Sequence, residues 1–329
     1  MTRAWTLASR PSGVPADEDF ALIDIDLPPL KEGEVRVANR WLSVDPYMRG
    51  RMNDVKSYVP PFQLGAPMDG GAIGEVVESR ADALRPGDMV QHMAGWRDAA
   101  VIPAAAAQKL PALEVPPQAF LGQLGMPGMT AYFGLLAVGE AKPGDTVFVS
   151  AAAGAVGSTV VQVAKAKGMT VIGSAGGSDK CAWVRDLGAD QVIDYKADEP
   201  LVKALGRAAP EGIDVYFDNV GGQHLDAAIA HAKPRGRLAI CGMIDMYNTG
   251  APTTLRYAAR IIGARLKIEG FIVSDYMDRA DEFYREMGAL LADGRFRREE
   301  TVFEGIEQTP AAFRGLFTGE NRGKMLVKI

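Results

Sequence analysis

The chain has 329 residues, of which 47% are hydrophobic and 23% are charged, and its formal net charge is -5. This length and balance indicate a globular protein of about two domains, and the acidic charge argues against a nucleic-acid partner and against binding to anionic membranes. Two cysteines and three histidines are too few for a disulfide framework and make a zinc cluster difficult to assemble.

The chain begins with MTRAWTLASRPSGVPADEDF, which contains no apolar core of signal-peptide length. No apolar run elsewhere is long enough to span a bilayer. We therefore expect a cytoplasmic protein whose partners are small molecules, and which binds neither membranes nor nucleic acid.

Residues 1–124 are expected to form a β-rich domain. Segments such as FALIDIDLPPL and GEVRVANRWLSVDP alternate or cluster apolar residues between proline and glycine breakers. Short strands with frequent turns are typical of a small barrel or sandwich.

Residues 125–295 follow a different pattern, in which strand-like and helix-like segments alternate. The predicted strands are 146–152, 170–175, 191–195, 214–219, 237–242 and 266–273, and the predicted helices are 158–167, 180–187, 199–208 and 222–232. This alternation predicts an α/β fold with a parallel sheet, and the number of strands matches the doubly wound dinucleotide-binding fold. Residues 296–329 are expected to form a strand, a helix and a closing strand, KMLVKI, that returns to the first domain.

The turn between the first of these strands and its helix contains the segment AAGAVG, residues 152–157. It matches Gly-x-Gly-x-x-Gly with alanine at the first position. Gly154 would let the backbone approach a pyrophosphate, Gly157 would let the helix pack on the strand, and the helix N-terminus would supply N–H groups. A packing turn in a fold without nucleotide has a similar composition, but the strand before it and the helix after it favour dinucleotide binding.

The end of the second strand indicates which dinucleotide is bound. An NAD site usually has an acidic residue there, about 20 residues beyond the glycines, whereas this chain has VIGSAGGSDK. Ser174 and two glycines leave room for a 2′-phosphate, and Lys180 could pair with it. Asp179 is expected to cap the next helix. NADP is therefore favoured, although Lys180 could also be an ordinary solvated lysine.

The chain resembles the medium-chain dehydrogenase/reductase superfamily. Within it, the chain is similar to the zinc-independent leukotriene 12-hydroxydehydrogenase/prostaglandin reductases and to NADPH-dependent alkenal and curcumin double-bond reductases. The motifs that carry the resemblance are VDPYMRGRM (44–52), GMPGMTAYFGL (125–135), SAAAGAVGS (150–158), YFDNVGG (216–222), ICGMIDMYN (240–248), EGFIV (269–273) and GENRGKMLVKI (319–329).

The resemblance implies a GroES-like catalytic domain formed by residues 1–124 and the returning segment 296–329, with an NADP-binding Rossmann domain, residues 125–295, between them. It also implies a homodimer in which two Rossmann sheets meet edge to edge. The zinc-binding relatives carry a His-Glu pair where this chain has GAPMDGGAIG, so we expect no metal site and no Lewis-acid catalysis.

The resemblance also assigns the cofactor-binding residues. They are Met126, Thr130, Gly154, Ala155, Val156, Gly157, Lys180, Tyr195, Asn219, Cys241, Gly242, Met243, Tyr247, Phe271, Ile272, Val273 and Asn321. Several have plainer alternatives: Tyr195 could be an ordinary strand-end tyrosine, Cys241 a small buried filler, and Phe271 and Val273 core or interface residues.

The activity implied is NADPH-dependent reduction of the carbon-carbon double bond of an α,β-unsaturated aldehyde or ketone. Hydride would reach the β-carbon, and the enolate oxygen would need a donor. Tyr247 is the expected catalytic residue, acting with the nicotinamide ribose hydroxyl, and Tyr47 is expected to line the substrate pocket. Alternatively, Tyr247 could simply close the pocket.

Other functions remain consistent with the sequence. A related zinc-free quinone reductase or an allylic alcohol dehydrogenase would share the fold and cofactor. A non-catalytic NADPH-binding protein would share the turn but would not need Tyr247.

Overall fold

A computed structural model describes residues 1–112, 114–292, 294 and 296–329. The chain divides into two compact units. Unit 1 contains residues 1–121 and 300–329, and unit 2 contains residues 122–299. Among the described residues, no helix has both the length and the apolar character needed to cross a membrane.

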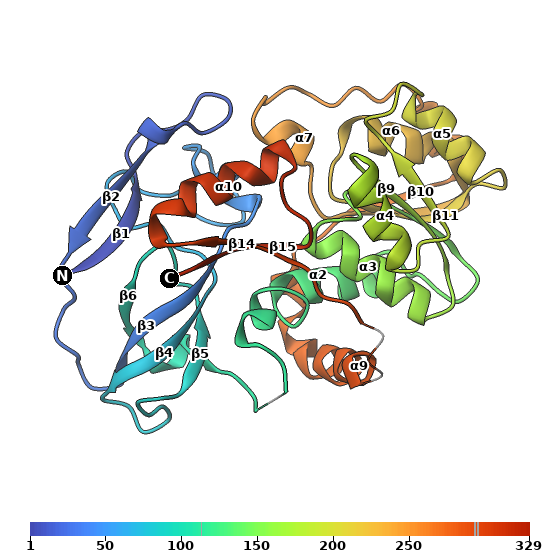
Figure 1. The fold of residues 1–329 in the computed structure, drawn as a ribbon. Helices are drawn as coiled ribbons and strands as arrows, with labels where there is room; N and C mark the ends of the chain where they lie inside the picture. The colour runs from blue at the N-terminus through green and yellow to red at the C-terminus, as the bar shows by residue number, and fades with distance from the viewer. Residues whose placement is uncertain (113, 293, 295) are drawn as a thin grey trace. The chain divides into compact units, whose positions relative to one another are not determined.

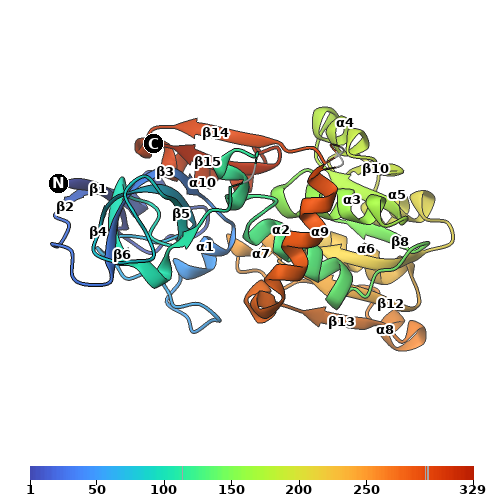
Figure 2. The same cartoon turned by 90° about the horizontal axis from the view of Figure 1, so that it is seen from below.

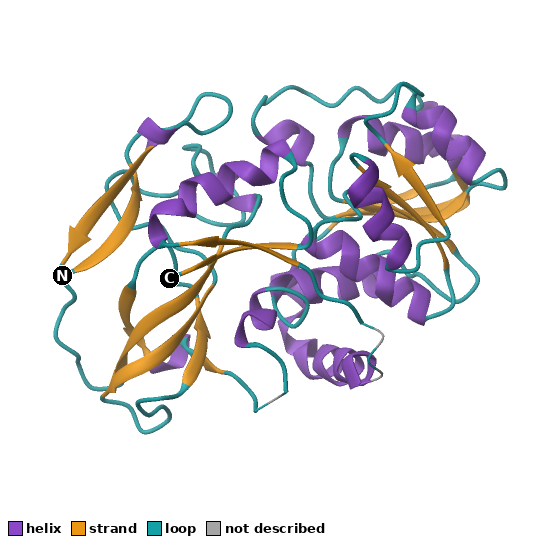
Figure 3. Ribbon diagram, viewed as in Figure 1, coloured by secondary structure: helices purple, strands orange, loops and turns teal. Residues whose placement is uncertain are grey.

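Unit 1 is built mainly from strands (Figure 3). Its strands are β1 (Thr2–Leu7), β2 (Phe20–Ile25), β3 (Glu34–Ser43), β4 (Ala72–Ser79), β5 (Met89–His92), β6 (Ala99–Pro103), β7 (Gln108–Lys109), β14 (Glu300–Glu304) and β15 (Lys324–Lys328). Its α-helices are α1 (Tyr47–Arg51) and α10 (Thr309–Thr318).

The C-terminal strand lies inside the sheet of unit 1. The seven-stranded order is β14-β15-β3-β4-β5-β7, with β6 pairing β3. β15 is parallel to β14 and antiparallel to β3, with Val327 opposite Leu42 (Figure 1). Both of these side chains are fully buried, so the last residues of the chain contribute directly to the core of unit 1.

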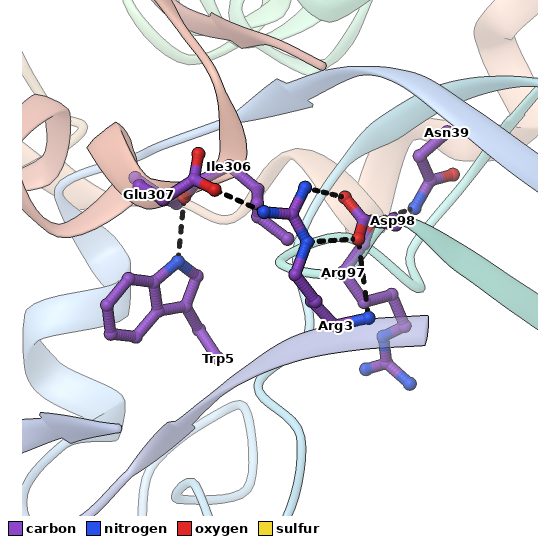
Figure 4. Close-up of polar contacts among 8 residues, drawn as sticks. Arg3, Trp5, Asn39, Arg97, Asp98, Ile306 and Glu307 are labelled. Carbon is purple, nitrogen blue, oxygen red and sulfur yellow. Dashed lines mark hydrogen bonds and ion pairs between the residues drawn. The ribbon is translucent and has the colours of Figure 1, made fainter. Parts of the chain in front are cut away.

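The first strand is tied to the same C-terminal segment by polar contacts. Figure 4 shows Arg3 between Asp98 and Glu307, and both carboxylates pair with its guanidinium. The indole Nε1 of Trp5 donates to the Ile306 carbonyl at 2.7 Å. Unit 1 is therefore assembled from both ends of the chain.

Unit 2 alternates strands and helices. Its strands are β8 (Thr146–Val149), β9 (Thr170–Ala175), β10 (Gln191–Asp194), β11 (Ile213–Asp218), β12 (Ala232–Ile240) and β13 (Lys267–Gly270). Its α-helices are α2 (Met126–Phe133), α3 (Ala155–Ala166), α4 (Ser178–Asp186), α5 (Leu201–Ala208), α6 (Gly222–His231), α7 (Ile244–Tyr247), α8 (Ala259–Ala264) and α9 (Ala280–Ala292).

These strands form one six-stranded sheet in the order β10-β9-β8-β11-β12-β13 (Figure 2). Every pairing is parallel. The order runs outward from β8 in one direction and from β11 in the other, which is the doubly wound arrangement predicted from the sequence.

The alternation of side chains places two helical layers on this sheet. Phe148, Ile172 and Tyr216 point to one face, where they form a core cluster with residues of α5 and α6. Their neighbours along the strands, such as Val147 and Phe217, are equally buried and point to the opposite face. Both faces of the sheet are therefore covered, as is usual for a parallel sheet.

The predicted element types are correct, and the differences lie at element ends. β9 has the predicted bounds, whereas β8 ends at Val149 because the chain turns away at Ala151, which has a φ of 48°. β13 stops at Gly270, because a 3-10 helix begins at Val273.

Candidate active site

One edge of the sheet in unit 2 gathers most of the predicted site residues. Parallel strands place all their carboxyl ends at the same edge, and a ligand binds outside those ends where the strand order reverses. Here the reversal lies between β8 and β11. The Gly154–Gly157 turn follows β8, Asn219 follows β11, Cys241 follows β12 and Phe271 follows β13.

The turn after β8 leads directly into α3. Gly154 is the N-cap of that helix and supplies no side-chain cap to the first-turn N–H groups. An added Cβ at Gly157 would lie 2.3 Å from the Ala151 carbonyl oxygen, so glycine is required there for the helix to approach the strand. The result is an uncapped helix N-terminus of the kind that binds phosphate.

The ends of β9 and β10 lie next to one another and carry basic residues. An added Cβ at Gly176 would lie 2.9 Å from both the Tyr195 hydroxyl and Cε of Lys196. Burial, and secondarily the charge of Lys196, lowers the pKa of Lys180. The positive charge of Lys196 beside Gly176, with that of Lys180 near enough to affect it, suits an anion.

Asp194 organises this corner through the backbone. Its Oδ1 accepts the N–H groups of Gly177 and Lys196, both at 2.9 Å. The expectation that Asp179 caps α4 is wrong, because the N-cap is Gly177 and there is no side-chain cap. Asp179 lies in the first turn instead, where its charge complements the helix dipole.

Ser174 does not face an open site. It is fully buried, and its Oγ lies 2.9 Å from Nε2 of His224. Burial lowers the pKa of His224 to about 4, so this ring is neutral at pH 7. The His224 ring stacks on Phe148 and packs edge to face against Tyr195. The contact with His224 fixes the position of Tyr195, which follows β10.

A buried carboxyl group lies where β11 ends. Asp218 has no exposed surface, and its Oδ1 accepts the Tyr216 hydroxyl at 2.6 Å and the Ser150 hydroxyl at 3.2 Å. The same oxygen accepts the N–H groups of Val220 and Gly221, both at 2.8 Å. Burial raises the pKa of Asp218. This group joins the ends of β8 and β11 and the loop that follows them.

Asn219 is fixed across the same junction. Its backbone N–H donates to Ser150 Oγ at 2.9 Å, and its side-chain Nδ2 donates to the Ser150 carbonyl at 2.8 Å. Because Ser150 precedes the glycine turn, this pair of bonds connects the predicted pyrophosphate turn to Asn219, another predicted cofactor-binding residue.

Tyr247 is the last residue of the short helix α7, which follows β12. The N–H groups of Cys241 and Gly242 donate to the Asp218 carbonyl at 2.8 and 3.0 Å. Burial raises the pKa of the Cys241 thiol to about 12, which favours the reading of Cys241 as a packing residue rather than a nucleophile. The Met243 N–H donates to the Tyr247 hydroxyl at 3.2 Å.

The remaining predicted residues of unit 2 lie on α2 and after β13. Met126 begins α2, and the Thr130 hydroxyl donates to its carbonyl at 2.7 Å. Phe271 packs edge to face on Phe217. Ile272 and Val273 follow it, and Val273 begins a 3-10 helix. The contacts of these residues with a cofactor stay predictions.

Tyr47 and Asn321 belong to unit 1. Tyr47 begins α1, and its pKa is raised, first by burial and then by the charge of Asp45. Asp45 is held by a buried ion pair with Lys324, at 2.9 Å. Asn321 lies in the turn before β15, where its Nδ2 donates to the Gly323 carbonyl.

Comparisons with known proteins identify the chain. Residues 3–110 match a family model described as the N-terminal domain of oxidoreductase, and residues 155–293 match one described as zinc-binding dehydrogenase. Prostaglandin reductase 1 of Bos taurus is 42% identical to this chain, and the match covers 99% of this chain and 98% of the bovine protein. A 2-alkenal reductase (NADP(+)-dependent) of Nicotiana tabacum is 39% identical to this chain, and the match covers 97% of this chain and 94% of the tobacco protein.

The chain belongs to the zinc-independent medium-chain dehydrogenase/reductase family. The structure of CurA from Vibrio vulnificus in complex with NADPH agrees, with a TM-score of 0.93 and 41% identity over 99% of this chain and 98% of that one. Unit 1 is the GroES-like part of the family fold, and unit 2 is its Rossmann part. Among the residues that the structure describes, no three His, Cys, Asp or Glu side chains gather as a metal site would require.

Sequence reasoning missed several polar residues of this family member. Ser150, Asp218 and His224 are buried at the sheet edge, and Lys196 lies beside Gly176. The one signal available was an aspartate inside the apolar strand VYFD, since a charge there must be paired or hydrogen-bonded. Ser150 and Asp218 lie within the motifs SAAAGAVGS and YFDNVGG, but the motifs by themselves assign them no role.

Proposed function

We propose that this protein is an NADPH-dependent reductase of the carbon-carbon double bond of α,β-unsaturated aldehydes and ketones. The observation that carries the proposal is the position of Tyr247, in the short helix α7 that follows β12, at the same sheet edge as the uncapped N-terminus of α3. The relatives support it, since one is named as an NADP(+)-dependent 2-alkenal reductase and the CurA structure contains NADPH.

The residues at the sheet edge fit this cofactor. The first turn of α3, Gly154 to Gly157, would receive the pyrophosphate on N–H groups that no side chain caps. Lys180 and Tyr195 would hold the adenosine 2′-phosphate, since β9 ends on Ala175 and is followed by two glycines rather than a carboxylate. Bound NADPH supplies a hydride and a ribose hydroxyl near the nicotinamide.

The nicotinamide end would be enclosed by residues of several elements. Within unit 2 these are Met126, Thr130, Asn219, Cys241, Gly242, Met243, Phe271, Ile272 and Val273. Asn219 is hydrogen-bonded to Ser150, and Cys241 to the Asp218 carbonyl. These bonds fix the chain at both residues, so they would orient the nicotinamide ring at low entropic cost.

Tyr247 supplies the group that the chemistry requires. Hydride addition at the β-carbon of an enone leaves negative charge on the carbonyl oxygen, and that oxygen needs a hydrogen-bond donor. The Tyr247 hydroxyl donates to it. The bond from the Met243 N–H uses a lone pair of the hydroxyl oxygen and not its proton, and a hydroxyl that accepts such a bond becomes a stronger donor. The α-carbon takes its proton from solvent. Tyr47 of unit 1 stays the residue that the resemblance predicts for the substrate pocket.

The test compares the parent with Tyr247→Phe. We expect kcat for a short 2-alkenal to fall by about a hundredfold, the size of a general-acid contribution, while the dissociation constant for NADPH changes less than about twofold, because the phenyl ring is kept. Unchanged alkenal turnover would show that Tyr247 has no catalytic role. Oxidation of NADPH by a benzoquinone without any enone activity would favour a quinone reductase instead.

We also propose that the protein is a homodimer joined through the edge strand β13. β13 ends the sheet of unit 2 (Figure 2), and Ile268 on it and Ile262 on α8 are 39% and 83% exposed. An edge strand offers its outer side to a second copy, and exposed apolar residues on it and on the helix that precedes it suit such a pairing. Light scattering tests this: the parent should have about twice the mass of the chain, and Ile268→Pro should be monomeric.

A further inference from the structure

We infer that Gly242 is a positioning residue for the hydroxyl of Tyr247. We call residues 241–243 the tyrosine seat, because the Tyr247 hydroxyl rests against their backbone. The inference rests on the proposed function, since it assumes that this hydroxyl meets the substrate oxygen. The role that we assign to Gly242 depends on its lack of a side chain, which leaves space for the Tyr247 hydroxyl.

The Tyr247 hydroxyl lies close to the backbone of both Met243 and Gly242. The Met243 N–H donates to it at 3.2 Å. A Cβ added at Gly242 would lie 3.1 Å from the same oxygen and 3.5 Å from the Asn219 carbonyl oxygen. A methyl group there would therefore press on the hydroxyl. The bond to Met243 is already at the long end of the normal range, so a small displacement would weaken it.

Backbone hydrogen bonds to the loop after β11 hold the tyrosine seat in place. The Cys241 and Gly242 N–H groups donate to the Asp218 carbonyl at 2.8 and 3.0 Å, and the Asp245 N–H donates to the Val220 carbonyl at 3.2 Å. The side chain of Asp218 is itself buried and holds Val220. A methyl group at residue 242 would therefore displace the tyrosine rather than the backbone.

Gly242 is not retained for its backbone conformation. It is not among the glycines with positive φ, so alanine is compatible with the local backbone. This makes Gly242→Ala a probe of space alone. The matched control is Gly263→Ala on α8, where an added Cβ meets nothing within 4 Å.

A double-mutant cycle tests the inference. At saturating NADPH and enone, we expect Gly242→Ala to lower kcat about tenfold in the parent, since catalytic groups tolerate displacements of only about half an ångström. In the Tyr247→Phe background, which lacks the hydroxyl, the same change should alter kcat less than about twofold. Gly263→Ala should leave kcat unchanged.

Amide hydrogen exchange provides a readout that needs no substrate, cofactor or activity. In the free protein, the Met243 amide should exchange slowly in the parent and about tenfold faster or more in Tyr247→Phe, which removes its acceptor. This comparison does not require the Gly242→Ala variant to fold.

The two failures can be distinguished. An equal loss of kcat from Gly242→Ala in both backgrounds, no loss in the parent, or equal Met243 exchange in parent and Tyr247→Phe would overturn the positioning role and leave the proposed function intact. If Tyr247→Phe has the kcat of the parent, the catalytic role of Tyr247 is wrong, and the positioning role fails with it.

Discussion

Lys180 is the residue on which the choice between NADPH and NADH depends. It lies in the first turn of α4, the helix that follows β9, and its pKa is lowered by burial and by the charge of Lys196. We predict that Lys180→Ala raises the dissociation constant for NADPH about tenfold or more, because a charge-assisted bond to phosphate is lost, and that the constant for NADH barely changes.

Fluorescence titration of both nucleotides measures this effect. Lys203→Ala, an exposed lysine on α5, is the control and should bind both nucleotides as the parent does. Equal affinity of the parent for NADPH and NADH would contradict the assignment of this corner to a 2′-phosphate.

His224 makes stability depend on pH. Burial lowers the pKa of His224 from 6.5 to about 4, so between these values the unfolded chain binds a proton that the folded chain does not. The free energy of unfolding should therefore fall as the pH drops from 6.5 toward 4, by at most about 3 kcal/mol from this residue, and level off below. Urea unfolding should show a weaker pH dependence in His224→Gln, and an identical dependence would show that the ring is not buried as neutral.

At the scale of elements, the glycine turn depends on a close approach between α3 and β8. A Cβ at Gly157 would lie 2.3 Å from the Ala151 oxygen and 2.8 Å from Cα of Ala152, and backbone atoms cannot yield as a side chain can. We predict that Gly157→Ala weakens NADPH binding about tenfold or more and lowers the melting temperature, since overpacking costs about 1–3 kcal/mol.

The control for this prediction is Gly288→Ala on α9, where a Cβ would meet nothing within 4 Å. Alanine is favoured over glycine inside a helix, so this variant should melt no lower than the parent and should bind NADPH normally. Calorimetry and titration of both variants suffice, and equal NADPH affinity in Gly157→Ala and the parent would contradict the role of the turn.

The element types were predictable because their periodicities are strong. The inner strands β8, β9 and β11 of unit 2 are short, largely buried runs, and β9 was located to the residue. The ends were less predictable, because they depend on single backbone angles such as the φ of 48° at Ala151. Within the site, the motifs identified the loops. The buried bonds of Ser150 and Asp218 were not predictable, because they join residues 68 positions apart.

At the scale of the whole molecule, the two ends of the chain meet in unit 1. Lys324 on β15 forms its ion pair with Asp45, and the two side chains are only 5% and 8% exposed. We predict that Lys324→Met lowers the free energy of unfolding by about 3–5 kcal/mol, because it leaves a buried carboxylate unpaired.

Denaturant unfolding of this variant, compared with Lys324→Met/Asp45→Asn, measures the effect. The double variant should recover part of the loss, because the uncompensated charge is gone. A single variant as stable as the parent would show that the pair does not hold β15 to the rest of unit 1.

We expect the protein to reduce a carbon-carbon double bond by adding hydride to the β-carbon. The most direct test supplies NADPH carrying deuterium at the transferable position together with a 2-alkenal, and locates the label in the product by NMR. We expect a saturated aldehyde with one deuterium on the β-carbon. A label on the carbonyl carbon, with an allylic alcohol as the product, would contradict it.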